Sequence, residues 1–157
     1  MAGPVFENWI DTLGLMEVND PALEKPAYRK PHNGHVLLAH ELETRIADAL
    51  RSHRIKRKLS VQKFARLLGI GSRTYARYEN GRSRLTVSRL VHACEALGAH
   101  PEDLLEHAAP HLFGKDEEHA RLLRLTFNEL RKLDRGGLEA IRIVLPHLTP
   151  KEMEADH

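Results

Sequence analysis

The sequence predicts an all-α protein: a group of five helices, with an N-terminal helix before it and a C-terminal helical hairpin after it. Apolar residues recur at spacings of three and four along most of the chain, as on one face of a helix. Glycines and capping residues divide this pattern at short intervals, and no stretch alternates convincingly like a strand. The 157 residues, 41% hydrophobic and 29% charged, are also too apolar for a wholly disordered chain.

Residues 1–36 are expected to form a short helix followed by a connector. The helix carries one apolar stripe, made of Val5, Phe6, Trp9, Ile10 and Leu13, and Gly14 is expected to end it. The next segment contains Pro21, Pro26 and Pro31 and few apolar residues. Proline favours an extended connector over a helix there. The stripe of Trp9 must therefore pack against a distant part of the protein or against another chain.

Residues 37–108 are expected to form the group of five helices. The first runs from Leu37 to Arg57, with Leu38, Leu42, Ile46, Leu50 and Ile55 facing inward. Ser60 and Thr86 are good N-caps, Gly69 and Gly98 suit left-handed helix ends, and Pro101 suits a first helical position. These signals predict the following helices: Val61–Leu68, Arg73–Tyr78 (ended by Asn80–Gly81), Val87–Leu97, and a short last helix from Pro101. A short glycine-containing turn between the second and third of the five helices indicates a helix-turn-helix.

Residues 109–157 are expected to form a helical hairpin. Its first helix has an acidic start at Asp116–Glu118, and its second is broken at Pro146. The apolar faces are formed by Leu122, Leu123, Phe127, Leu130 and Leu133, and by Leu138, Ile141, Val144, Leu145 and Leu148. A hairpin of this size is too small for a stable core of its own. We expect it to form a dimer interface.

The overall charge of +2 hides three regions of different sign. Residues 1–50 have a net charge of −4 and residues 90–157 one of −5, whereas residues 51–89, with 12 basic and 1 acidic side chains, have +11. The apolar residues of the basic segment recur at helical spacing, so the segment is expected to fold rather than form a loose tail. A folded module of this charge is typical of a nucleic-acid-binding surface.

The order of several short motifs resembles the Cro/phage-repressor type of helix-turn-helix regulators, the xenobiotic-response-element family. The motifs are Leu59 to Ile70, Tyr78-Glu79-Asn80-Gly81, Leu90 to Gly98, and Pro101 to Leu105. The resemblance covers roughly residues 40–108. It implies a five-helix lambda-repressor-like DNA-binding domain whose third helix enters the major groove, usually in a symmetric dimer.

The resemblance and the helix pattern together assign DNA contacts. The first turns of a recognition helix meet base edges, which selects Ser72, Arg73, Thr74 and Arg77. Arginines four residues apart can each present two donors to guanine, which favours a guanine-containing half-site. The phosphate contacts expected from the family pattern are Gln62, Lys63, Arg82, Ser83 and Arg84. Arg54 and Glu79 match a structural ion pair of the family between the first and third helices.

Three positions depart from the family pattern. Val61 stands where a phosphate-binding Gln is usual, and the Gln follows at Gln62. Gly71 stands where a Ser or Thr cap is common, and Tyr78 replaces a more frequent Trp or Leu. The run Arg54, Lys56, Arg57 and Lys58 has two explanations: a phosphate-binding patch, or favourable charge at the end of the preceding helix.

Other classes of protein are not indicated by the sequence. The chain has no membrane-length apolar stretch and no secretory signal, and its single Cys94 cannot form an internal disulfide, so a cytoplasmic location is expected. Cys94 is expected to be buried. His107 and His111 are four residues apart but Pro110 lies between them, so we expect no metal site and no cofactor. Catalytic motifs are missing as well, so we expect no enzyme.

The predicted function is a sequence-specific DNA-binding transcriptional regulator, acting as a dimeric repressor on double-stranded DNA. One alternative is an antitoxin that represses its own operon and binds a toxin through the flanking helices. A second alternative is a sensor whose helical appendage binds a small ligand.

Overall fold

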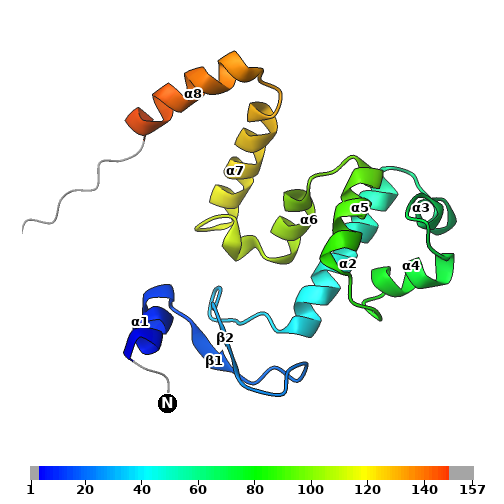
Figure 1. Cartoon of the computed structure of the whole chain (residues 1–157), viewed down its shortest axis with the longest axis horizontal. Helices are drawn as coiled ribbons and strands as arrows, with labels where there is room; N and C mark the ends of the chain where they lie inside the picture. Colours follow the sequence, from blue (N-terminus) through cyan, green and yellow to red (C-terminus); the bar gives the residue numbers. More distant parts are fainter. Residues whose placement is uncertain (1–3, 149–157) are drawn as a thin grey trace, which may run out of the picture.

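The computed structural model describes residues 4–148, and in this range the chain is mainly helical (Figure 1). The elements in chain order are α1 Pro4–Leu13, β1 Met16–Val18, β2 Ala27–Arg29, α2 Ala39–Lys56, α3 Val61–Leu67, α4 Ser72–Glu79, α5 Val87–Leu97, α6 Pro101–Ala108, the 3₁₀ turn η1 Pro110–Leu112, α7 Glu117–Leu130 and α8 Arg135–Leu148. The predicted all-α fold is confirmed, with α2 to α6 as the central five-helix group and helical extensions on both sides.

The segment between α1 and α2 contains a small antiparallel hairpin, where only an extended connector was predicted. β1 and β2 pair in a register that sets Met16 opposite Arg29. Pro21 lies in the turn and Pro26 directly precedes β2, so the prolines mark the limits of the strands. Strands of three residues are too short to show an alternating pattern, which explains why the sequence did not reveal them.

The core of the five-helix group is small and closely packed. Tyr75 and Phe64 are fully buried, and their rings meet edge to face with centroids 4.9 Å apart. Leu50 and Leu104 are the other large side chains that are almost completely inaccessible. Cys94 is buried among them, as expected, and its burial raises the pKa of the thiol. A buried thiol of this kind packs as a small apolar group rather than reacting.

The predicted helix boundaries are confirmed where capping residues set them. The side-chain oxygens of Ser60 and Thr86 accept hydrogen bonds from backbone N–H groups in the first turns of α3 and α5. Gly69 and Gly98 end these helices with φ values of +66° and +58°, which glycine adopts without steric cost. Gly71 has no side chain to cap α4, which nevertheless begins at Ser72.

One inward position of α2 was predicted wrongly. Ile55 was expected to face the core, but its side chain is 55% exposed. The inward place is taken by the preceding Arg54, which is 8% exposed. A pattern of apolar residues cannot find this position, because the buried side chain is charged.

The C-terminal extension is attached to α6 through α7. Arg124 of α7 forms an ion pair with Glu106, and Arg131 forms one with Glu102, at 2.8 and 3.1 Å. The chain also crosses itself closely here: a Cβ atom added to Gly114 would lie 2.4 Å from the backbone nitrogen of Ala120. Only glycine is compatible with this approach.

The pair α7 and α8 is open rather than closely packed. α8 turns away from the end of α7, so that the two helices form a V (Figure 1). None of the residues of α8 is buried. The helix continues through Pro146 to Leu148, and the predicted break at Pro146 was therefore wrong. None of the described helices is long and apolar enough to cross a membrane.

Candidate nucleic-acid interface

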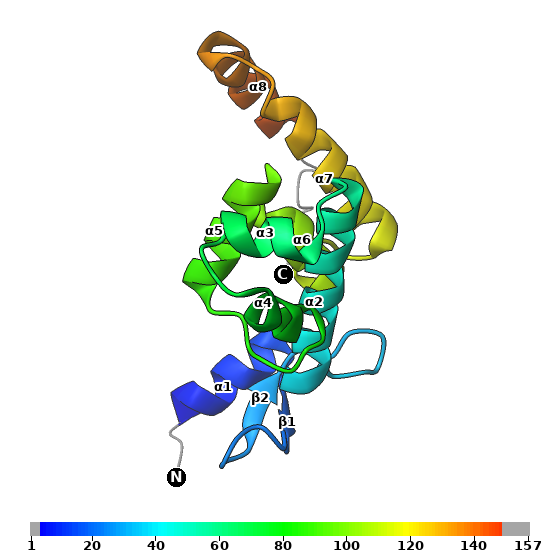
Figure 2. The same ribbon diagram turned by 90° about the vertical axis from the view of Figure 1, so that its right-hand side faces the viewer.

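The helices α3 and α4 lie at the right-hand side of the molecule in Figure 1, the side that faces the viewer in Figure 2, and a short turn of four residues connects them. The side chains of α4 divide into two faces. Tyr75 and Glu79 are buried, whereas Arg73, Thr74 and Arg77 are exposed and Ser72 is partly exposed. The residues expected to contact bases thus lie together on the first turns of α4.

The loop after α4 carries the next group of expected DNA contacts. Gly81 has φ +64°, which turns the chain sharply after the helix. Arg82 and Arg84 are exposed in this loop. Between them, the Ser83 hydroxyl accepts a hydrogen bond of 3.0 Å from Nε of Arg77. The two terminal nitrogens of Arg77, which can donate together to guanine O6 and N7, have no partner in the described residues.

The remaining expected phosphate contacts are at the start of α3. Gln62 and Lys63 are both exposed, in the first turn of the helix. The backbone N–H of Lys63 donates to the Ser60 hydroxyl at 3.2 Å. The cap therefore fixes the backbone from which the two side chains extend.

A buried ion pair holds α4 against α2. Nε and Nη2 of Arg54 donate to the two carboxylate oxygens of Glu79 at 2.7 and 2.9 Å. Nη1 of Arg54 donates to the carbonyl of Leu59 at 2.6 Å, and the Tyr75 hydroxyl donates to Glu79. The bonds to Glu79 raise the pKa of Arg54, and burial raises that of Tyr75. This network fixes the rotation of α4, and hence the direction in which Arg73 and Arg77 point.

Part of the basic segment has a structural task. Nη2 of Arg57 donates to the carbonyl of Gly98 at 2.9 Å, and Nη1 of Arg89 donates to the carbonyl of Leu68 at 3.0 Å. Both arginines therefore satisfy carbonyls at the ends of other helices. Neither contact had been predicted, because the partners are 41 and 21 residues apart. Together with Arg54, these side chains bond inside the domain, so the charge of +11 overstates what is available to a ligand.

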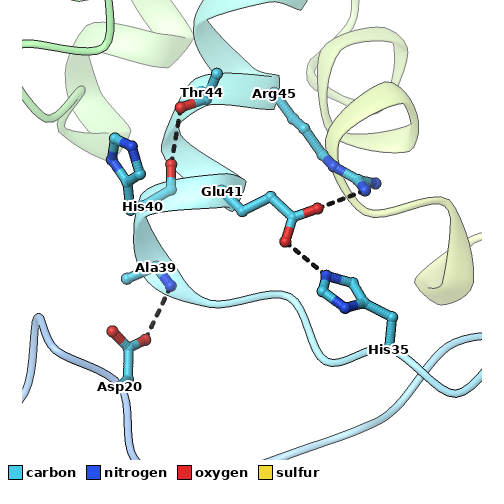
Figure 3. Close-up of polar contacts among 7 residues, drawn as sticks. All are labelled: Asp20, His35, Ala39, His40, Glu41, Thr44 and Arg45. Carbon is cyan, nitrogen blue, oxygen red and sulfur yellow. Dashed lines mark hydrogen bonds and ion pairs between the residues drawn. The ribbon is translucent and has the colours of Figure 1, made fainter.

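Asp20 is a further structural residue that the sequence analysis missed. Its carboxylate accepts hydrogen bonds from the backbone N–H groups of Ala22 and Ala39, at 3.0 and 2.8 Å. The bond from Ala39 caps α2 from the N-terminal extension (Figure 3). These bonds lower the pKa of Asp20, and the nearby positive charges of Arg29 and Arg84 act in the same direction. Asp20 thus connects the N-terminal extension to the five-helix group.

The histidines are not gathered into a metal centre. No group of three or more His, Cys, Asp or Glu side chains within residues 4–148 is placed to hold a metal ion. The ring of His111 lies beside that of His32, with centroids 5.6 Å apart. His107 lies at the exposed end of α6.

Together, three features indicate a helix-turn-helix domain: the short turn between α3 and α4, the exposed basic face of α4, and the buried ion pair behind it. Residues 45–108 match the helix-turn-helix domain family. The chain therefore carries such a domain between its two extensions. Transcriptional regulators use domains of this class to place a recognition helix in the major groove.

Several solved structures are similar to part of this chain. The clp gene regulator ClgR from C. glutamicum is 28% identical with a TM-score of 0.43, over 45% of this chain and 92% of ClgR. The restriction-modification controller protein C.AhdI from Aeromonas hydrophila is 23% identical with a TM-score of 0.38, over 39% and 92% of the two chains. Hydroxypropylphosphonic acid epoxidase from S. wedmorenis is 32% identical with a TM-score of 0.38, over 40% of this chain and 33% of the enzyme. No curated protein matches the sequence.

Proposed function

We propose that the protein is a cytoplasmic transcriptional repressor that binds a pseudo-palindromic operator as a homodimer. The observation that carries the proposal is the outward face of α4, where Arg73 and Arg77 are exposed one helical turn apart while Tyr75 and Glu79 are buried behind them. In a two-fold dimer the two copies of α4 would lie about 34 Å apart and enter successive major grooves on one side of the DNA. This role requires no catalysis.

The side chains have two tasks in this proposal. Base edges are read by Ser72, Arg73, Thr74 and Arg77. The bond to Ser83 uses only the Nε of Arg77, so both terminal nitrogens remain free for guanine O6 and N7. The phosphate contacts set affinity and register without reading sequence. They are assigned to Gln62, Lys63, Arg82, Ser83 and Arg84.

The division of tasks is tested by comparing Arg77→Ala with Arg84→Ala. Arg77→Ala should reduce the preference for the operator over random DNA by about 1–3 kcal/mol. Arg84→Ala should weaken binding to both DNAs equally and reduce the salt slope by roughly 1 for each subunit. Both are measured by fluorescence anisotropy with a footprinted operator and a scrambled duplex. Arg135→Ala, which removes a 93% exposed arginine of α8, is the control and should change neither. Equal effects of Arg77→Ala and Arg84→Ala on specificity would contradict the assignment.

The salt dependence tests the docking as a whole. If each subunit neutralises about four phosphates, the logarithm of the binding constant of the dimer should fall against the logarithm of the salt concentration with a slope of roughly −7. A slope near zero would be incompatible with a basic surface that follows the DNA backbone.

The C-terminal extension, residues 109–157 in our division of the chain, is proposed to form the dimer interface. The side chains of α8 that could form an apolar core are exposed in the single chain, Val144 by 47% and Leu145 by 50%. Monomeric proteins rarely leave an apolar stripe of this length uncovered. A second copy of the same helix pair would cover it with an identical, self-complementary surface.

Two matched substitutions in α8 test this interface. Leu145→Glu places a charge on the apolar stripe, whereas Ile143→Glu places it about 200° around the helix, on the other face. Both residues are exposed in the single chain, at 50% and 71%, so neither change should disturb the fold of a subunit. Sedimentation equilibrium should show a monomer for Leu145→Glu and a dimer for Ile143→Glu. A dimer in both cases would place the interface elsewhere.

An antitoxin remains the second candidate, because α1 offers another uncovered apolar face. Val5 is 82% and Trp9 60% exposed there. Since Trp9 is the single tryptophan of the chain, its emission reports on this face directly. A blue shift on adding the product of an adjacent gene would favour an antitoxin, whereas an unchanged emission with that product would favour the repressor alone.

A further inference from the structure

A cavity of about 320 Å³ lies where the two extensions meet α2. Its walls come from three separate segments: the β2 strand and the loop after it, the first turns of α2, and the η1 turn that leads to α7. The N-terminal and C-terminal extensions thus share one cavity on the DNA-binding domain. The volume is at the lower end of the range for small-molecule sites.

The walls combine an apolar body with positive charge. The apolar lining includes Leu37, Leu42 and Leu112, together with the alanines at the start of α2 and before η1. The basic lining residues are Arg29, Lys30 and His111, and no acidic residue lines the cavity. Lys30 has no hydrogen-bond or ion-pair partner within residues 4–148, and its side chain is exposed.

Two acidic side chains, Asp20 in the N-terminal extension and Glu41 in the first turn of α2, are already bonded to other groups. Asp20 accepts two backbone N–H groups, and Glu41 binds His35 at 2.7 Å and Arg45 at 2.7 Å (Figure 3). Neither carboxylate is therefore free to turn into the cavity and neutralise its basic wall.

His111 provides the second, independent observation. Its Nδ1 is a buried atom without a hydrogen-bond partner. Within residues 4–148, every other buried side-chain nitrogen or oxygen has such a partner. Buried polar atoms without a partner are rare in folded proteins, and they often mark a place where a ligand or water binds. Burial lowers the pKa of His111, and the positive charges of His32, Lys30 and Arg45 lower it further. Every charged neighbour that affects His111 is thus basic.

Two other cavities differ in this respect. One, of about 370 Å³ between α2, α6 and α7, is lined by acidic and basic residues together, among them the ion pair of Glu106 with Arg124. Another, of about 170 Å³ between α6 and α7, is bounded by that pair and by the ion pair of Glu102 with Arg131. Their charges are largely balanced inside the protein, so neither favours a ligand of one sign.

We propose that the cavity between the two extensions and α2 binds a small carboxylate with an apolar body, whose charged group meets Lys30 and His111 and whose body meets the leucines. The bound molecule would join both extensions to α2. This proposal does not depend on DNA binding, and its failure would leave the repressor proposal unaffected.

The test uses the full-length protein and two small probes of similar shape, para-fluorobenzoate and its neutral amide, observed by fluorine NMR. The carboxylate should bind saturably, and the amide at least about tenfold more weakly, since it lacks the charge that Lys30 pairs with. Lys30→Gln should weaken carboxylate binding at least about fivefold, and Lys30→Arg should retain it. Lys25→Gln removes the same charge from the turn between β1 and β2, outside the cavity, and should have no effect.

The pH dependence gives a second readout. Because a bound anion favours the protonated form of His111, whose pKa is lowered in the free protein, affinity for the carboxylate should rise as the pH falls toward and below the ordinary histidine pKa of about 6.5. His111→Gln should remove this dependence while circular dichroism shows an unchanged fold. Equal binding of acid and amide, equal effects of Lys30→Gln and Lys25→Gln, or no saturation by para-fluorobenzoate below about 10 mM would each overturn the assignment.

Discussion

Replacing Glu79 by alanine is expected to destabilise the helix-turn-helix domain strongly, although Glu79 lies on the side of α4 that faces away from DNA. The substitution removes the acceptor of three hydrogen bonds, two from Arg54 and one from Tyr75. The guanidinium of Arg54, which belongs to a residue only 8% exposed, then keeps its charge but loses its counter-ion. An unpaired buried charge costs much more than the loss of the ion pair itself.

The expected magnitude follows from the network that remains. Breaking a buried pair by removing one partner costs about 3–5 kcal/mol. Arg54 retains its bond to the Leu59 carbonyl, at 2.6 Å, so the lower end of this range, about 3 kcal/mol, is expected. That corresponds to roughly a 150-fold change in the unfolding equilibrium. It is a large part of the about 5–15 kcal/mol that stabilises a typical domain.

Urea unfolding followed by far-UV circular dichroism measures the loss. A triple variant, Arg54→Met with Tyr75→Phe and Glu79→Leu, replaces all three polar groups by apolar ones and should recover most of the stability, because no buried charge is left without a counter-ion. The Leu59 carbonyl loses the bond from Arg54 in this variant, so the recovery is not complete. Glu139→Ala is the control: it breaks an ion pair with Arg135 whose side chains are 61% and 93% exposed. Such pairs contribute at most about 0.5 kcal/mol.

Two results would refute this reasoning. One is a loss for Glu79→Ala no larger than that for Glu139→Ala, since burial would then have no consequence. The other is a triple variant as unstable as Glu79→Ala, because packing rather than an uncompensated charge would then explain the effect.

Three further predictions concern the caps and the titrating groups. Ser60→Ala should cost about 1 kcal/mol of unfolding free energy in urea titrations, because the first turn of α3 loses its side-chain cap. The hydrogen bonds from the N–H groups of Ala22 and Ala39 lower the pKa of Asp20 in the folded protein, so its stabilising effect is complete above the pKa of an unfolded aspartate, about 3.9, and is lost as the pH falls through the lower folded value. The protection factor of the Ala39 amide against hydrogen exchange, which is the observed rate corrected for the intrinsic rate at each pH, should therefore fall in acid, and Asp20→Asn should show the lower protection already at neutral pH. Burial lowers the pKa of His53, so the unfolded chain binds more protons below about pH 6.5 and stability should fall there. His53→Gln should make the pH profile of the melting temperature flatter in that range, and an unchanged profile would contradict the assignment.

Local chemistry made much of the five-helix domain predictable. Ser60 and Thr86 begin helices, and Gly69 and Gly98 end them, because each satisfies a requirement within a few residues of its own position. The faces of α4 were predictable for the same reason, since a helix turns by a fixed angle per residue. Tyr75 therefore points inward whenever Arg73 and Arg77 point outward.

Contacts between distant residues were not predictable. Asp20 caps a helix that starts 19 residues later, and Arg57 bonds a carbonyl 41 residues away. Either side chain could equally have remained in solvent, and only the arrangement of the helices determines whether an acceptor or donor comes within reach. The cavity beside Lys30 and His111 depends in the same way on two extensions meeting at α2.

The sequence by itself determined the class of domain, the limits of the helices with local caps and the segregation of charge, because capping, periodicity and composition act within a few residues along the chain. The tertiary structure decided which of the basic residues are internal bonding partners and which are exposed, and it separated α8 from α7. The physical reason is that an amphipathic pattern specifies which face of a helix avoids water but not which surface covers it. For Leu145 and its neighbours no other part of residues 4–148 supplies that surface, and for Arg54 it is the carboxylate of Glu79.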